Sequence, residues 1–92
     1  MAYKVIFQKE ALDKIQDAFD WYEGQKLGLG YELIEEIEIC NDYLSINPQQ
    51  YSFINDLYRR VKTNRFPYLL VYEIEEKTVI VLNFRHVKQK PL

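Results

Sequence analysis

Cysteine, histidine, glycine and proline are all scarce in this chain, and the shortages exclude several classes of protein. Its 92 residues include one cysteine, one histidine, three glycines and three prolines. The lone Cys40 cannot form a disulfide within the chain, which argues against a disulfide-stabilised secreted domain. One histidine and one cysteine do not provide the ligand spacing of a metal site, so we expect no metal and no other cofactor.

Long apolar stretches are missing too. No run approaches the ~20 residues that cross a bilayer, and the first residues lack the apolar region and cleavage site of a signal peptide. The sequence therefore predicts a cytoplasmic protein without a membrane partner. What the chain does have is enough for one core, because 48% of its residues are hydrophobic and 15% are aromatic. We expect residues 1–92 to fold as a single domain.

Charge is distributed unevenly along the chain. The formal net charge is only −2, yet residues 1–57 carry four lysines against eleven acids, a net charge of −7, and residues 58–92 carry eight cations against three acids, a net charge of +5. Such asymmetry is typical of an interaction surface, here one for an acidic or polyanionic partner. The alternative is that acidic helices and a basic sheet neutralise each other within one fold.

Hydrophobic periodicity predicts two helices among four strands. Apolar residues recur at Leu12, Ile15, Phe19 and Tyr22, which are helical spacings of three and four, and Asn47-Pro48 ends the second helix. The expected elements are a strand at 3–7, helices at 8–23 and 29–46, and strands at 58–63, 68–74 and 78–87. This β-α-α-β-β-β order predicts an α+β fold, with an antiparallel helical hairpin on one face of a small, mainly antiparallel sheet. The pairing of the first strand stays open.

Side-chain alternation assigns faces to the strands. In the last strand, Ile80 and Leu82 share a face with Phe84 and His86, and this is the better candidate for the core. In the 58–63 strand, Arg60 and Lys62 share the face opposite Val61. We therefore expect a basic set of side chains on the face or edge of the sheet that the helices leave open.

Several short motifs occur in a characteristic order along this framework. They are Trp21-Tyr22-Glu23, Gly28-Leu29-Gly30, Asn47-Pro48 with Tyr51, Arg65-Phe66-Pro67-Tyr68 with Tyr72, and His86 followed by Pro91. With these motifs the chain resembles the RelE/ParE superfamily of toxins from bacterial type II toxin–antitoxin, or plasmid stabilisation, modules, over nearly its whole length. The resemblance implies a cognate antitoxin as partner, with which the toxin can form a hetero-oligomer.

The superfamily contains two mechanisms. RelE-like toxins cleave mRNA on the ribosome, whereas ParE-like toxins bind and poison DNA gyrase. In the Tyr68–Tyr72 strand, Leu69 occupies the position at which RelE-like nucleases have an arginine. The tyrosine that those enzymes have near the C-terminus is missing as well. The resemblance therefore favours a ParE-like toxin that is not an enzyme. The alternatives are an mRNA endoribonuclease and a non-toxic binding module on the same fold.

The candidate site residues are cations and aromatic residues of the C-terminal half. His86 is the only side chain expected to titrate near neutral pH without help; the alternative to a general base is a neutral histidine packed at a strand end. If the chain is a nuclease, the candidate catalytic residues are Arg65, Arg85 and His86. The candidate residues for binding a partner or phosphate are Arg59, Arg60, Lys62, Arg65, Tyr68 and Arg85.

Overall fold

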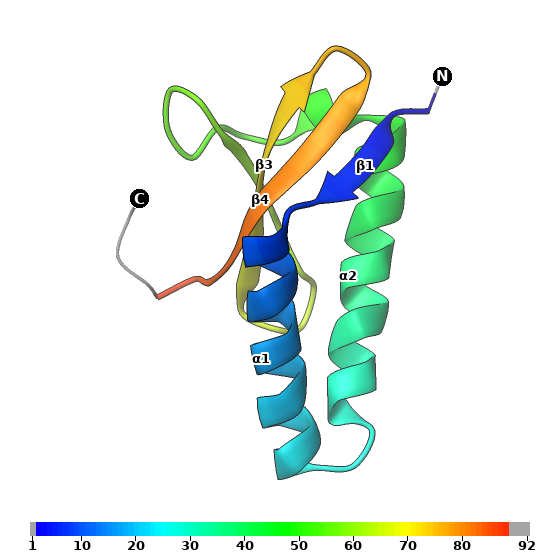
Figure 1. Ribbon diagram of the computed structural model, residues 1–92, viewed down its shortest axis with the longest axis vertical. Coiled ribbons are helices and arrows are strands. Elements are labelled where there is room, and N and C mark those ends of the chain that lie inside the picture. Colours follow the sequence, from blue (N-terminus) through cyan, green and yellow to red (C-terminus); the bar gives the residue numbers. More distant parts are fainter. Residues whose placement is uncertain (1, 89–92) are drawn as a thin grey trace.

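The computed structural model describes residues 2–88 and contains every element that the sequence predicts, in the predicted order (Figure 1). Helix α1 continues through Gly24 for two residues beyond its predicted end. The elements are β1 (Lys4–Phe7), α1 (Lys9–Gln25), α2 (Leu29–Ile46), the single 3-10 turn η1 (Pro48–Gln50), β2 (Arg59–Lys62), β3 (Tyr68–Glu75) and β4 (Thr78–His86). No helix among these residues is both long and apolar enough to cross a membrane.

The four strands form one sheet in the order β1-β4-β3-β2. Strands β2, β3 and β4 are a continuous antiparallel meander, whereas β1 pairs with β4 in parallel. A parallel pair requires a long crossover connection, and here the helical hairpin is part of it. The predicted α+β class is confirmed, and the partner of the first strand is the last one.

Both helices lie side by side on one face of the sheet, and their far end extends beyond it (Figure 1). One cluster of buried side chains joins the two helices and the sheet. Helix α1 contributes one stripe of this core and α2 a second, and the sheet contributes the rest. The most deeply buried members are Ala11, Leu33, Leu44, Leu70, Tyr72, Val79 and Val81. The opposite face of the sheet carries no helix.

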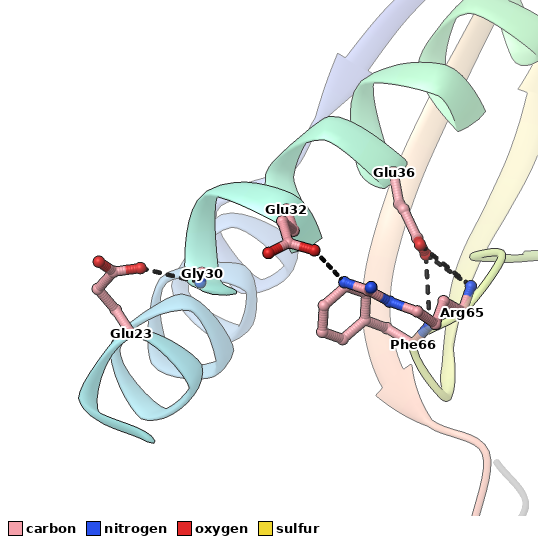
Figure 2. Close-up of polar contacts among 6 residues, drawn as sticks. All are labelled: Glu23, Gly30, Glu32, Glu36, Arg65 and Phe66. Carbon is pink, nitrogen blue, oxygen red and sulfur yellow. Dashed lines mark hydrogen bonds and ion pairs between the residues drawn. The ribbon is translucent and has the colours of Figure 1, made fainter. Parts of the chain in front are cut away.

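Helix α2 begins in a way that explains two of the sequence motifs. Gly28 adopts a φ of +91°, a conformation that favours glycine, and its position has no side-chain cap. The carboxylate of Glu23, near the end of α1, instead accepts the N–H group of Gly28 at 2.8 Å and that of Gly30 at 2.9 Å. Figure 2 shows the hydrogen bond to Gly30. An acidic side chain from one helix thus satisfies the unpaired amides at the positive end of the other.

The prediction that Ile80 and Leu82 face the core together with Phe84 is wrong. Val79 and Val81 are fully buried, whereas Ile80 and Leu82 remain partly exposed. The cause is a β-bulge, because β4 advances by one extra residue at Leu82 in its pairing with β3. An extra residue reverses the alternation of side chains, so odd-numbered positions face the helices before the bulge and even-numbered positions after it.

Candidate functional site

The predicted alternation of the basic strand is confirmed. Strand β2 lies at the edge of the sheet, Val61 is buried in the core, and Arg60 and Lys62 on either side of it are exposed. The cationic side chains between residues 58 and 65 therefore lie in different surroundings. What each cation contacts decides whether it is available to a partner.

Arg59 is tied to the chain segment that precedes its own strand. Its guanidinium donates hydrogen bonds to the carbonyls of Gln49 at 3.0 Å and Tyr51 at 2.7 Å. It also lies over the ring of Phe53, 4.1 Å from the centroid, in a cation–π contact. Arg59 therefore holds residues 49–53 against β2.

Lys62 closes the turn between β2 and β3. Its ammonium group donates to the carbonyls of Thr63 at 3.0 Å, Asn64 at 3.1 Å and Phe66 at 3.4 Å. These bonds use the three donors of a lysine. Although the side chain is exposed, its charge is directed at the turn.

Arg65 is bound to helix α2 (Figure 2). Its guanidinium forms an ion pair with Glu32, and its backbone N–H donates to both carboxylate oxygens of Glu36, at 2.9 and 3.1 Å. The N–H of Phe66 reaches Glu36 as well, at 3.3 Å. The hydrogen bond to Glu32 is the main reason that the pKa of Arg65 is raised. At this turn, the acidic helix α2 and the basic residue Arg65 neutralise each other within the fold.

Arg60 and Arg85 lie on the open face of the sheet, the face away from the helices. Arg85 pairs with Leu69, and Leu69 pairs in turn with Lys62, so a leucine stands between two cationic positions that are roughly 10 Å apart across three strands. Within residues 2–88 no carboxylate or carbonyl group accepts a hydrogen bond from the Arg60 guanidinium, so this cation of the 58–65 segment is available to a partner.

Tyr68 and His86 face the helices instead. The Tyr68 ring stacks on Phe84, with centroids 4.6 Å apart, and meets the His86 ring edge-on at 5.4 Å. Burial, followed by a hydrogen bond with Tyr22, raises the pKa of Tyr68 to about 12. His86 accepts the backbone N–H of Lys88 on Nδ1 at 3.1 Å and, with α1 residues such as Asp17, borders a small cleft of about 390 Å³.

The three candidate catalytic residues therefore occupy three separate surfaces. Arg65 is at the turn against α2, Arg85 is on the open face of the sheet, and His86 is on the helix side. Adjacent residues of a strand point to opposite faces, which separates the guanidinium of Arg85 from the imidazole of His86. No group of three metal-ligating side chains occurs in the part of the chain that the structure describes.

A groove with a volume of about 1000 Å³ lies between α2 and the edge strand β2. Ile39 and Tyr43 line its helix wall and are each about half exposed, at 51% and 52%. Glu35 lies on the same wall. Cys40 lies at the base, 4% exposed, and burial raises the pKa of its thiol to about 11. An uncharged, buried thiol is a poor nucleophile.

Sequence reasoning missed this groove, although a signal was present. Ile39, Tyr43 and Ile46 follow one another at spacings of four and three, which is a second apolar stripe on α2 beside the one that enters the core. All three are exposed in the structure. An apolar stripe that stays exposed beside the core stripe is a candidate contact surface.

Comparison with known proteins identifies the family. The family model for the ParE toxin of type II toxin–antitoxin systems, parDE, matches residues 5–91. The chain belongs to the ParE toxin family. Comparison with curated protein sequences gives no match.

Solved structures with the same fold come from both branches of the superfamily. A chain from the chromosomal ParDE toxin–antitoxin system of P. aeruginosa superimposes with a TM-score of 0.79 at 14% identity, covering 95% of this chain and 98% of that one. The RelE–RelB complex of Pyrococcus horikoshii OT3 gives 0.59 at 13% identity, with 98% and 100% covered. The isolated RelE toxin of E. coli gives 0.57 at 21% identity, with 97% and 88% covered.

Several motifs that carry the resemblance to this ParE family have structural roles, whereas Pro91 lies outside the described residues. Glu23 and Gly30 form the junction of the helical hairpin. The hydroxyl of the fully buried Tyr72 donates to the carbonyl of Pro48 at 2.6 Å, which ties the end of α2 to the sheet. In this ParE-family chain these motif residues therefore build the scaffold.

Proposed function

We propose that this ParE-family toxin acts by binding a protein target, DNA gyrase, and not by cleaving RNA. The observation that carries the proposal is the open face of the sheet, where Leu69 separates the positions of Lys62 and Arg85. An aliphatic side chain offers no hydrogen bond to a phosphate. A protein surface, in contrast, can be recognised by a mixed apolar and cationic patch.

RNA cleavage makes demands that this arrangement does not favour. Attack by a 2′-hydroxyl on the neighbouring phosphate requires a general base, a general acid and cations that stabilise the developing charge, all directed at one phosphate. Here His86 faces α1, Arg85 faces away from the helices, and Arg65 is paired with Glu32. The mRNA endoribonuclease is therefore the second candidate, and it would require a different arrangement of these side chains.

For the cognate antitoxin we propose the groove between α2 and β2 as a docking site. Ile39 and Tyr43 offer apolar area that the toxin alone does not bury. At the adjacent edge, the N–H of Lys62 points away from β3 and has no partner within residues 2–88, which suits an added strand. Binding there would form a toxin–antitoxin hetero-oligomer in the cytoplasm, where the target is.

Two assays on purified toxin test the mode of action. We expect ATP-dependent supercoiling by gyrase to be inhibited and mRNA on translating ribosomes to remain intact. Arg60→Ala should weaken gyrase inhibition without lowering the melting temperature, because exposed charges contribute little to folding. Lys62→Ala should instead lower the melting temperature, because three carbonyls lose their donor. Ribosome-dependent cleavage by the wild type that disappears in His86→Ala or Arg85→Ala would refute the proposal and establish the nuclease.

The third alternative, a non-toxic binding module, is separated by growth. Induction of the toxin without its antitoxin should arrest bacterial growth and induce the response to DNA damage. Unchanged growth, despite folded protein at a measurable level, would favour the module that has lost toxicity.

A further inference from the structure

The loop at residues 52–58 is an exposed apolar projection next to the open face of the sheet. Figure 1 shows it standing away from both helices, between η1 and β2. Its two large apolar side chains face solvent, with Phe53 54% exposed and Leu57 69% exposed. Apolar side chains displayed together on a projection indicate a contact surface more often than isolated ones do.

Hydrogen bonds hold this loop in one conformation. The side-chain oxygen of Asn55 accepts the N–H groups of Leu57 and Tyr58, each at 2.8 Å. The N–H of Ile54 donates to the carbonyl of Tyr58 at 2.8 Å, which closes the loop on itself. The turn is therefore formed before any partner arrives, and the entropic cost of ordering a flexible loop on binding is reduced.

The loop is also anchored to β2. Phe53 pairs with Arg59 as an isolated antiparallel bridge, and the N–H of Arg60 donates to the carbonyl of Ser52 at 3.1 Å. The guanidinium of Arg59 lies under the Phe53 ring. This places the projection directly beside Arg60, the cation without an intramolecular partner in residues 2–88.

We propose that the 52–58 loop and Arg60 together are the surface by which the toxin contacts its protein target, while the antitoxin docks in the groove between α2 and the Lys62 end of β2. Phe53 and Leu57 enter an apolar depression of the target, and Arg60 pairs with a carboxylate at its rim. Aromatic residues and arginine dominate the energetics of protein interfaces. Cations also outnumber acids next to the loop, because β2 carries Arg59, Arg60 and Lys62 whereas the loop contains one acid, Asp56, so the complementary partner surface is acidic.

This assignment rests on the proposed function, and the test separates the two. Leu57→Ser is the cleanest change, because the side chain is exposed and the loop's hydrogen bonds use only the backbone of this residue. We expect half-inhibition of purified gyrase to require about 30-fold more Leu57→Ser toxin than wild type, as for loss of a central interface residue. Phe53→Ser and Arg60→Ala should act in the same direction. Leu27→Ser is the matched control, since Leu27 is 90% exposed at the far end of the helical hairpin.

Folding stability, antitoxin binding and the oligomeric state decide the outcome together with gyrase inhibition. Urea midpoints of Leu57→Ser and the control should equal that of the wild type, and both variants should bind the cognate antitoxin as tightly as the wild type does. If wild-type toxin inhibits gyrase and Leu57→Ser, Phe53→Ser and Arg60→Ala inhibit it equally well, the loop assignment fails and the proposed function stands. Loss of antitoxin binding in Leu57→Ser, or a wild-type dimer that this change dissociates, also overturns the assignment. Failure of the wild type to inhibit gyrase overturns the proposed function itself.

Discussion

Replacing Glu23 by glutamine should destabilise the protein by about 2 kcal/mol, because this carboxylate is the cap of helix α2. It accepts two N–H groups, from Gly28 and Gly30, and the helix has no side-chain cap of its own. A glutamine retains one carbonyl oxygen but presents an NH₂ group to the second donor. Loss of one charge-assisted hydrogen bond costs about 1–2 kcal/mol, and loss of the interaction with the helix dipole adds about 0.3–1 kcal/mol.

Thermal and urea unfolding followed by circular dichroism measure this effect. For a domain of this size, about 2 kcal/mol corresponds to a fall of roughly 8–16 °C in melting temperature. Glu38→Gln is the matched control on α2, because Glu38 is exposed and caps no helix end, and it should change stability by less than about 0.5 kcal/mol. If Glu23→Gln and Glu38→Gln unfold at the same urea concentration, the carboxylate does not cap α2 in solution.

Two other changes probe the packing of the fold. Gly30→Ala should destabilise the protein by about 2–3 kcal/mol, because an added Cβ would lie 2.8 Å from the carbonyl oxygen of Phe19. In the control Gly24→Ala the added Cβ meets nothing within 4 Å, so this change should stabilise the helix by about 0.5–1 kcal/mol. Equal melting temperatures of the two variants would contradict the close contact between the helices. Burial raises the pKa of Cys40 to about 11 and leaves the side chain 4% exposed, so at pH 8 alkylation should be slower by at least about 100-fold in the native protein than in urea. Because the unfolded chain releases the thiol proton first, stability should fall as pH rises from 9 to 11, and less so in Cys40→Ala; a decline of equal size in both proteins would contradict the shift.

Local patterns were sufficient for most of the fold. Helical spacing identified both helices, Asn47-Pro48 marked the end of α2, and alternation placed Val61 in the core and Arg60 in solvent. These features depend on neighbours within a few residues, where backbone sterics and one-sided burial act directly on the sequence. The family resemblance drew on the same local motifs, and the match to the ParE toxin family confirms it.

Long-range contacts decided what the side chains of the basic run do. The charge distribution left open whether the cations at 58–65 form an interaction surface or are neutralised within the fold. In the structure Arg59 is directed at the carbonyls of Gln49 and Tyr51, and Arg65 at Glu32. A charge count contains no information on which acceptors the fold brings within reach. Only tertiary structure distinguishes a cation that holds a turn from one, such as Arg60, that can meet a partner.

The sequence by itself determined the order of elements, the α+β class and the faces of β2, because each is encoded by residues close together in the chain. The same alternation predicted that Arg85 and His86 lie on opposite faces of β4. Tertiary structure alone decided the parallel pairing of β1 with β4 and the bulge at Leu82. Pairing and register are set by contacts between strands that are distant in sequence, and one extra residue in a strand reverses every face after it. The groove between α2 and β2 likewise exists only once helix and edge strand lie side by side.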